Sequence, residues 1–174
     1  MSFIEDFHSD QVEFYATLGH AITQWASVER ALFLLYCHTI GEPESAAPIA
    51  AYYSIISFNA KLTMVDNALI ARYRSYPDVL KLWSPIKNYA GKRAKDRNEL
   101  AHNQLMIDPR IEGVASHRLV SLIFNPNPVL KGKNPRLNVT QIAGLAVKFN
   151  DVARQMDDLF ERLRLTPLPE LPNR

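Results

Sequence analysis

The stretch DQVEFYATLGHAITQWASVERALFLLYCHTI, residues 10–40, predicts one long helix near the start of the chain. Within it, mostly large apolar side chains recur at alternating steps of three and four residues: Tyr15, Leu18, Ile22, Trp25, Glu29, Leu32 and Tyr36. This spacing is typical of the seam along which two nearly parallel or antiparallel helices pack. Gly41 then stands where helices commonly end, and Pro43 follows it. The stretch therefore predicts a fold built from long, packed helices.

Glu29 is the one charged residue in this seam. A carboxylate on an apolar face costs free energy unless it is paired or lies at the edge of the bundle. Two interpretations stay open. Either the stem of Glu29 packs at the rim while its head stays in water, or Glu29 is an orienting carboxylate for Arg93 or Arg97 on a neighbouring helix.

A second seam, near the end of the chain, predicts a last helix from a cap at Thr140 to about Leu165. Its apolar positions again alternate by three and four: Ile142, Leu145, Phe149, Val152, Met156, Leu159 and Leu163. Between the two seams, residues 49–57 and 59–73 predict helical stretches, and Asn59 can cap the second. These stretches form either one kinked helix or two helices.

Residues 78–102 predict a further helix. Its expected buried side consists of Val79, Trp83, Ile86, Ala90 and Leu100. Pro85 falls inside this pattern and predicts either a kink or a later helix start at Ser84.

The same helix turns basic in its second half, through Lys87, Lys92, Arg93, Lys95 and Arg97. Such a run is either an ordinary solvated face or a set of contacts for an RNA backbone. In the second interpretation Lys92, Arg93 and Lys95 are candidate substrate-binding residues.

The helical period fails over the segment between this helix and the last one. Residues 119–124 predict a short strand, and residues 105–107 can pair with it as a hairpin closed by a turn around Gly113. The basic segment 131–136 is either an ordinary surface loop or part of a lid. Whether residues 105–139 form a lid is left open.

Together these patterns predict an all-α fold, a four-helix bundle with a small β-hairpin or loop insertion before the last helix. Residues 1–165 are expected to form a single helical-bundle domain. Residues 166–174 are rich in proline and are expected to form a flexible tail.

The chain has 174 residues, a net charge of +2 and 47% apolar residues, an ordinary globular composition. Cys37 is the only cysteine, so an internal disulfide is impossible and a reducing, cytoplasmic location is expected. Residues 1–10 carry acids and no apolar core, which argues against a signal peptide. No apolar run is long enough to cross a membrane, so no membrane partner is expected.

Several kinds of chemistry lack their motifs in this sequence. The five histidines show no helical metal spacing, and there are no paired cysteines, so no metal site is predicted. The glycines form neither a phosphate-binding loop nor a dinucleotide fingerprint, so no cofactor is expected.

The segment RNELAH, residues 97–102, carries the clearest chemistry. The guanidinium of Arg97 is a permanent cation whose planar donors suit phosphate oxygens, and the imidazole of a histidine can exchange a proton near neutral pH. Asn98 and His102 are four residues apart and share a helical face. By contrast, Arg97 and His102 lie ~7.5 Å apart along an ideal helix and ~140° apart around it. They meet at one ligand only if the helix ends or loosens there, or if a second copy supplies the missing partner.

This segment resembles the signature of the HEPN family, named for higher eukaryotes and prokaryotes nucleotide-binding. In that signature an arginine and an adjacent polar residue precede a histidine late in a helix of a small helical bundle. Arg97, Asn98 and His102 match it residue by residue, and the small Ala101 also fits. Many members carry a glycine after the histidine. Here Asn103 takes that place, and asparagine can adopt the left-handed conformation that ends a helix.

Many HEPN proteins are metal-independent endoribonucleases, and the resemblance implies that activity here. The 2′-hydroxyl of RNA attacks the neighbouring phosphate, so the catalyst has to move protons and neutralise charge. His102 would be the general base or acid, Arg97 would hold the non-bridging oxygens, and Asn98 would orient the histidine or the ribose. The resemblance also implies a homodimer with Arg97 and His102 of both chains in one composite site.

Other interpretations stay open. A toxin or defence protein controlled by an antitoxin or regulatory protein would fit a ribonuclease. The alternative is a non-catalytic HEPN module that binds RNA, a nucleotide or a partner protein. In a third interpretation the chain is a helical scaffold, Arg97 pairs with Glu29 or Asp96, and His102 simply favours the helix C-terminus.

Overall fold

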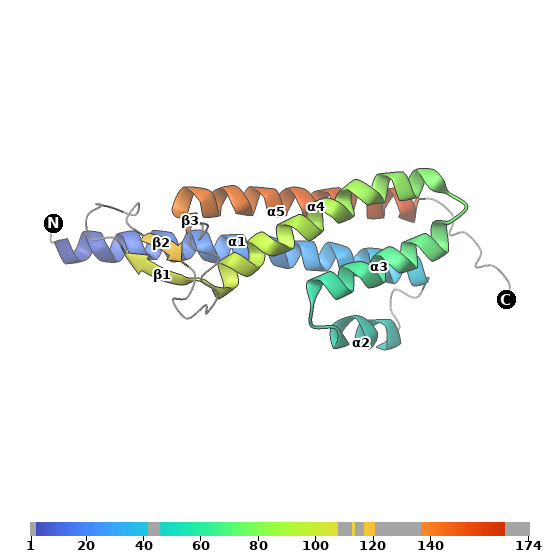
Figure 1. Ribbon diagram of the computed structural model, residues 1–174, viewed down its shortest axis with the longest axis horizontal. Coiled ribbons are helices and arrows are strands. Elements are labelled where there is room, and N and C mark those ends of the chain that lie inside the picture. The colour runs from blue at the N-terminus through green and yellow to red at the C-terminus, as the bar shows by residue number, and fades with distance from the viewer. Residues whose placement is uncertain (1–2, 42–45, 108–112, 114–116, 121–136, 166–174) are drawn as a thin grey trace, which may run out of the picture. The chain divides into compact units, whose positions relative to one another are not determined.

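The computed structural model describes residues 3–41, 46–107, 113, 117–120 and 137–165. Within them the chain forms five helices and a three-stranded antiparallel sheet (Figure 1). The helices are α1 (Phe3–Ile40), α2 (Ala46–Ser54), α3 (Phe58–Tyr73), α4 (Pro77–His102) and α5 (Val139–Arg164). The strands are β1 (Gln104–Ile107), β2 (His117–Val120) and β3 (Leu137–Asn138). The predicted all-α fold with a small β insertion before the last helix is confirmed.

The chain separates into two compact units. The first, which we call the sheet unit, comprises Met1–Gln24 and Lys95–Lys148; the second, the helical unit, comprises Trp25–Ala94 and Phe149–Arg174. Helices α1, α4 and α5 each contribute a segment to both units. The single domain predicted over residues 1–165 stays a prediction. The predicted tail, 166–174, and the basic segment 131–136 lie outside the described residues.

In the helical unit, aromatic packing joins α1 to two other helices. The ring centroid of Trp25 on α1 lies 4.6 Å from that of Phe58 on α3 and 5.2 Å from that of Phe149 on α5, both edge-to-face. Both aromatic pairs gain free energy from burial and from their edge-to-face geometry. The hydroxyl of Tyr52 donates to the backbone oxygen of Glu29 at 3.1 Å and ties α2 to α1.

The carboxylate of Asp66 joins α3 to α4 in the same unit. It accepts the indole N–H of Trp83 at 2.9 Å and the ammonium of Lys87 at 2.9 Å. Trp83 is only 1% exposed, so its N–H depends on this acceptor in place of water. The side chain of Asp66 is itself only 16% exposed, which strengthens the ion pair relative to a surface pair.

In the sheet unit, the strands follow one another in the order β1-β2-β3, all antiparallel. β1 pairs with β2 from Gln104 opposite Val120 to Ile107 opposite His117. The α1 segment of this unit packs on the sheet, because the ring of Phe14 lies 5.9 Å from the ring of His117 and both side chains are fully buried.

Several helix boundaries differ from those predicted, each for a local reason. The last helix is capped by Asn138 rather than Thr140: the Asn138 carboxamide oxygen accepts the N–H of Gln141, and the Gln141 side chain accepts the N–H of Asn138. This reciprocal pair satisfies two backbone donors at once. α3 begins at Phe58, one residue before the predicted cap Asn59.

Two boundary predictions concern glycine and proline. Gly41 is confirmed as the end of α1, since it adopts a φ of 79° and its N–H donates to the carbonyl of His38. The later start of α4 at Ser84 is wrong, because α4 begins at Pro77 and continues through Pro85. The two stretches predicted between residues 49 and 73 are separate helices, α2 and α3.

The buried face of α1 is only partly the predicted seam. Trp25 and Leu32 are buried, but Tyr15 is 51% exposed and Ile22 is 38% exposed. Ten residues of α-helix rotate Tyr15 ~80° away from the direction of Trp25, whereas Phe14 stays within ~20° of it. An exact three-and-four pattern drifts around a straight helix, so the covered face shifts from the predicted seam to Phe14.

We expect Asp66→Ala to lower the free energy of unfolding by about 1–3 kcal/mol, because it leaves the buried indole N–H of Trp83 without an acceptor. The measurement is urea denaturation followed by circular dichroism. Asp151→Ala is the control, since Asp151 on α5 forms only an exposed ion pair with Arg154. That change should cost no more than about 0.5 kcal/mol. Equal effects of the two variants would contradict the role assigned to Asp66.

Candidate functional site

The candidate site lies at the C-terminal end of α4, in the sheet unit. α4 remains α-helical up to His102, which confirms that His102 lies in the last turn. A single residue, Asn103, separates it from Gln104, the first residue of β1. The left-handed conformation expected for Asn103 is wrong, because among the described residues only glycines have a positive φ. The chain instead enters the extended strand directly, and its pairing with β2 holds that path.

Arg97 and Asn98 are in direct contact. The Nη1 of Arg97 donates to the carboxamide oxygen of Asn98 at 3.4 Å, a long hydrogen bond. The guanidinium is half-buried, and its Nε is fully buried without a hydrogen-bond acceptor among the described residues. The Nη1 end of the guanidinium, by contrast, makes its contact with Asn98 in an exposed position, where water still screens its charge.

Asn98 and His102 form the exposed part of the motif. They lie four residues apart on a continuous helix, so both project from one face. Both side chains are exposed. Lys95, three residues before Asn98, shares this face and is also exposed. We call Lys95, Asn98 and His102 the outer face of the motif.

Arg97 belongs to a different face of the same helix. Leu100, at the next step of three, is only 3% exposed, and Arg97 lies with it toward the packed side of α4. Because α4 does not loosen before His102, the ~140° between Arg97 and His102 is kept. The structure therefore places Arg97 in contact with Asn98 and places Asn98 on the same face as His102. It does not bring Arg97 and His102 of one chain to the same face.

The three candidate substrate-binding cations occupy different environments. Lys92 and Lys95 are exposed. Arg93 is only 8% exposed, and its guanidinium lies 5.3 Å from the ring centroid of Tyr89, a cation–π contact. Lys92 and Lys95 thus remain accessible to a polyanion, whereas Arg93 contributes to the packing of the helical unit.

Glu29, the candidate orienting carboxylate, is half-buried on α1. Its Oε1 accepts the indole N–H of Trp25 at 3.2 Å, one turn earlier on the same helix. This hydrogen bond explains how a carboxylate is accommodated in an apolar seam. A role in orienting Arg93 or Arg97 stays a prediction.

Glu99, which the sequence analysis did not single out, is the titratable residue of the motif with a perturbed environment. Burial raises the pKa of its carboxyl group, and the negative charge of Asp96, one turn earlier, raises the pKa further. Residue spacing could not predict this rise in pKa, because the rise depends on how far the folded chain excludes water from the carboxyl group. It indicates that the surroundings of Glu99, ~160° around the helix from Arg97, are partly shielded from water.

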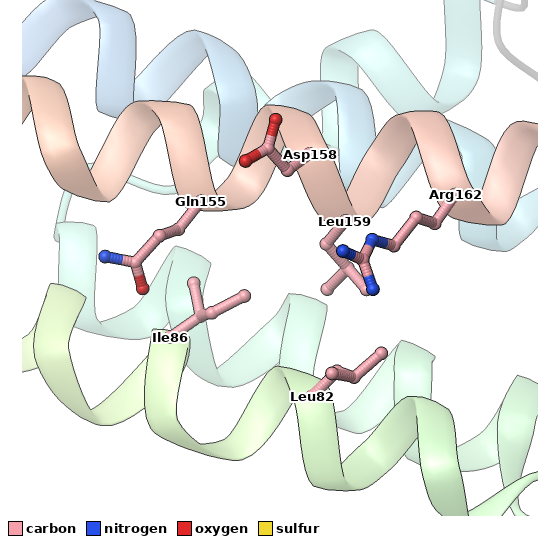
Figure 2. A pocket seen from close by; sticks show the side chains of 6 residues that line it. All are labelled: Leu82, Ile86, Gln155, Asp158, Leu159 and Arg162. Atoms are coloured by element: carbon pink, nitrogen blue, oxygen red, sulfur yellow. The ribbon is translucent and has the colours of Figure 1, made fainter.

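Two of the cavities formed by the described residues lie within the helical unit and are lined by residues outside the motif. Figure 2 shows a groove of about 180 Å³ between α4 and α5, with Leu82, Ile86 and Leu159 on its apolar sides. Gln155, Asp158 and Arg162 of α5 line the same groove. The other cavity, of about 250 Å³, lies between the ends of α1 and α5 around Phe33, Cys37 and Phe160. Cys37 is buried.

The described residues contain no group of three or more histidine, cysteine, aspartate or glutamate side chains placed to hold a metal ion. Among the described helices, none combines the length and apolar character that spanning a membrane would require.

Comparison with known proteins leaves the chain without a match among protein-family models, curated proteins and solved structures.

We expect Glu99→Gln to raise the free energy of unfolding at pH 7. The folded chain holds the proton of Glu99 more tightly than the unfolded chain, so the cost to folding grows as the pH rises above the ordinary pKa and is complete above the raised pKa. Below about pH 4.5, the ordinary value for a glutamate, both states are protonated and the gain should vanish. The measurement is urea denaturation across this pH range, with the exposed Glu13→Gln as control. A loss of stability in Glu99→Gln at pH 7 would contradict this account.

Proposed function

We propose that this protein is a metal-independent endoribonuclease of the HEPN type. The observation that supports it most is the contact between Arg97 and Asn98 in the penultimate turn of α4, with the exposed His102 one turn beyond Asn98. A phosphate-binding cation, a polar residue in contact with it and a proton-exchanging side chain are thus arranged along one helix end. Lys92 and Lys95, exposed on the same helix, add positive charge for an RNA backbone.

The reaction needs only groups that this helix end can supply. The 2′-hydroxyl of a ribose loses its proton and attacks the adjacent phosphorus, and the 5′-oxygen of the next nucleotide leaves and takes up a proton. The products are a cyclic phosphate and a 5′-hydroxyl. His102 exchanges the protons, Arg97 binds the non-bridging oxygens as their charge grows, and Asn98 orients the imidazole or the ribose.

The same geometry favours a site shared by two chains. Within one chain, Arg97 and His102 project from different faces of an unbroken helix. A two-fold axis beside the end of α4 would set Arg97 of each chain opposite His102 of the other. We therefore infer a homodimer with a composite cleft. Cleavage of cellular RNA would require control, so a toxin or defence role with an antitoxin or regulatory protein as partner fits this activity.

We expect the purified protein to cleave total RNA in the presence of a chelator. Arg97→Ala should lower the cleavage rate by at least about 100-fold, because the developing charge on the phosphate loses its fixed cation. His102→Ala should lower it by a similar factor, because proton transfer loses its catalyst. Arg154→Ala, which removes an exposed arginine of α5, is the matched control and should keep full activity.

Mixing the two inactive variants tests the shared site. A heterodimer of Arg97→Ala with His102→Ala retains one intact combination of arginine and histidine, so part of the cleavage should return. Restored activity supports two chains per site, and no restoration in a proven heterodimer places both groups in one chain. If the chain retains RNA at low salt without cleaving it, the nuclease proposal fails and a non-catalytic binding module is the better account.

A further inference from the structure

The cavity of about 250 Å³ between the ends of α1 and α5 lies wholly within the helical unit. We call it the α1–α5 cavity. Its wall consists of three aromatic rings and two smaller apolar side chains, those of Phe33, His38, Phe160, Leu34 and Cys37. None of the described residues that line the cavity belongs to the motif at the end of α4, so RNA cleavage does not account for it.

The wall of the α1–α5 cavity carries no formal charge at neutral pH. Burial raises the pKa of the Cys37 thiol, so the thiol keeps its proton. Burial also lowers the pKa of His38, and the positive charge of Arg72 lowers it further, so the imidazole is neutral. The two titratable side chains of the wall therefore behave as apolar or weakly polar surface.

This wall offers little to a water molecule. The Nε2 of His38 already makes a hydrogen bond of 3.1 Å with the hydroxyl of Tyr73, and a thiol is only a weak hydrogen-bonding group. A buried water needs two to four polar partners, whereas apolar cavities stay dry and accept apolar ligands. Since a cavity of roughly 150 Å³ with apolar walls holds one benzene ring, the larger α1–α5 cavity suits a body of about two fused rings.

Packing within the helical unit holds the rings of the wall in place. The ring centroid of Phe33 lies 5.1 Å from that of Tyr52 on α2, in an edge-to-face pair. The ring of His38 meets the ring of Phe160 edge-to-face, with their centroids 5.9 Å apart. A ligand would therefore meet a preformed surface, and binding would not have to order these side chains.

Arg164 supplies the charge at the rim of the α1–α5 cavity. Its side chain lines the cavity and is 62% exposed, so it lies where the cavity opens to water. The carboxylate oxygen Oε2 of Glu161 accepts from its Nε at 3.1 Å and lies 2.9 Å from its Nη2. A guanidinium carries five N–H donors, so this pair uses only part of its capacity. Among the described residues that line the cavity there is no carboxylate, and the charge of the rim therefore favours an anionic group.

We propose that the α1–α5 cavity binds a small aromatic carboxylate of about the size of naphthalene. Its rings lie between Phe33 and Phe160, where edge-to-face contacts and burial stabilise them. Its carboxylate lies at the rim and accepts hydrogen bonds from Arg164, whose planar donors suit a carboxylate. This binding site does not depend on the proposed ribonuclease activity, since the cavity and the motif belong to different compact units.

The test is isothermal titration calorimetry of the full chain with 2-naphthylacetate and, separately, with the neutral 2-naphthylacetamide. We expect one naphthylacetate per chain with a dissociation constant below about 1 mM. The amide should bind at least about threefold more weakly, because it lacks the charge that Arg164 recognises. Arg164→Gln should reduce the affinity for the acid to that for the amide. Arg154→Gln is the matched control, because Arg154 is also an exposed arginine of α5 paired with a carboxylate three residues earlier, and it should change neither affinity.

A second variant tests the position of the rings. Leu34→Trp fills the cavity and should weaken the binding of both ligands at least about tenfold. Leu18→Trp is its control, because Leu18 is also a half-buried leucine of α1 but lies in the sheet unit. Thermal unfolding shows whether each variant folds. If Leu34→Trp does not fold, the comparison of Arg164→Gln with Arg154→Gln decides, since both replace exposed side chains.

Three results would overturn the proposed site. The first is no saturable binding of naphthylacetate to the wild-type chain. The second is equal affinity of the wild-type chain for the acid and the amide, which would exclude recognition of an anion. The third is unchanged binding in a folded Leu34→Trp variant, which would place the ligand elsewhere. Tighter binding of the acid that is lost in Arg164→Gln and kept in Arg154→Gln supports the site.

Discussion

The arrangement of the candidate site depends on one constraint, the unbroken hydrogen-bonded backbone of α4 up to His102. The helix passes into β1 after a single residue, and the pairing of β1 with β2 fixes the path of the backbone at this junction. Side chains on such a segment project at angles that the helix alone determines. Arg97 therefore stays on the packed side while Asn98 and His102 stay outside. A looser helix end would have allowed one chain to gather all three groups; this one keeps Arg97 and His102 of one chain on different faces.

Burial affects two members of the motif on different sides of this helix end. It removes water from the Nε of Arg97 on the packed side, and it raises the pKa of Glu99, which lies ~160° around the helix from Arg97. In poorly solvated surroundings a cation attracts a phosphate more strongly, and a carboxylate opposes that attraction more strongly when ionised. The hydrogen bond to Asn98, long at 3.4 Å and exposed to solvent, restrains the guanidinium only weakly.

α1 has a covered side and an exposed side along its length. In the helical unit, Trp25 packs against Phe58 of α3 and Phe149 of α5; in the sheet unit, Phe14 packs against His117 of β2. The three-and-four pattern of residues 10–40 combines members of both sides, since Trp25 and Leu32 are buried while Tyr15 and Ile22 are exposed. A pattern that indicates one seam in the sequence is thus divided between positions packed within the chain and exposed positions.

The sequence by itself determined the positions of the helices, because a 3.6-residue period, a C-terminal glycine and proline breaks are local signals. All seven seam positions of the last helix are buried as predicted, from Ile142 to Leu163. The motif of Arg97, Asn98 and His102 was also readable, since it depends only on residue type and spacing. Only the tertiary structure decided which face of α1 is covered, which of the basic residues is buried, and that Glu99 has a raised pKa. These properties depend on which atoms from distant parts of the chain displace water, and no local pattern specifies that.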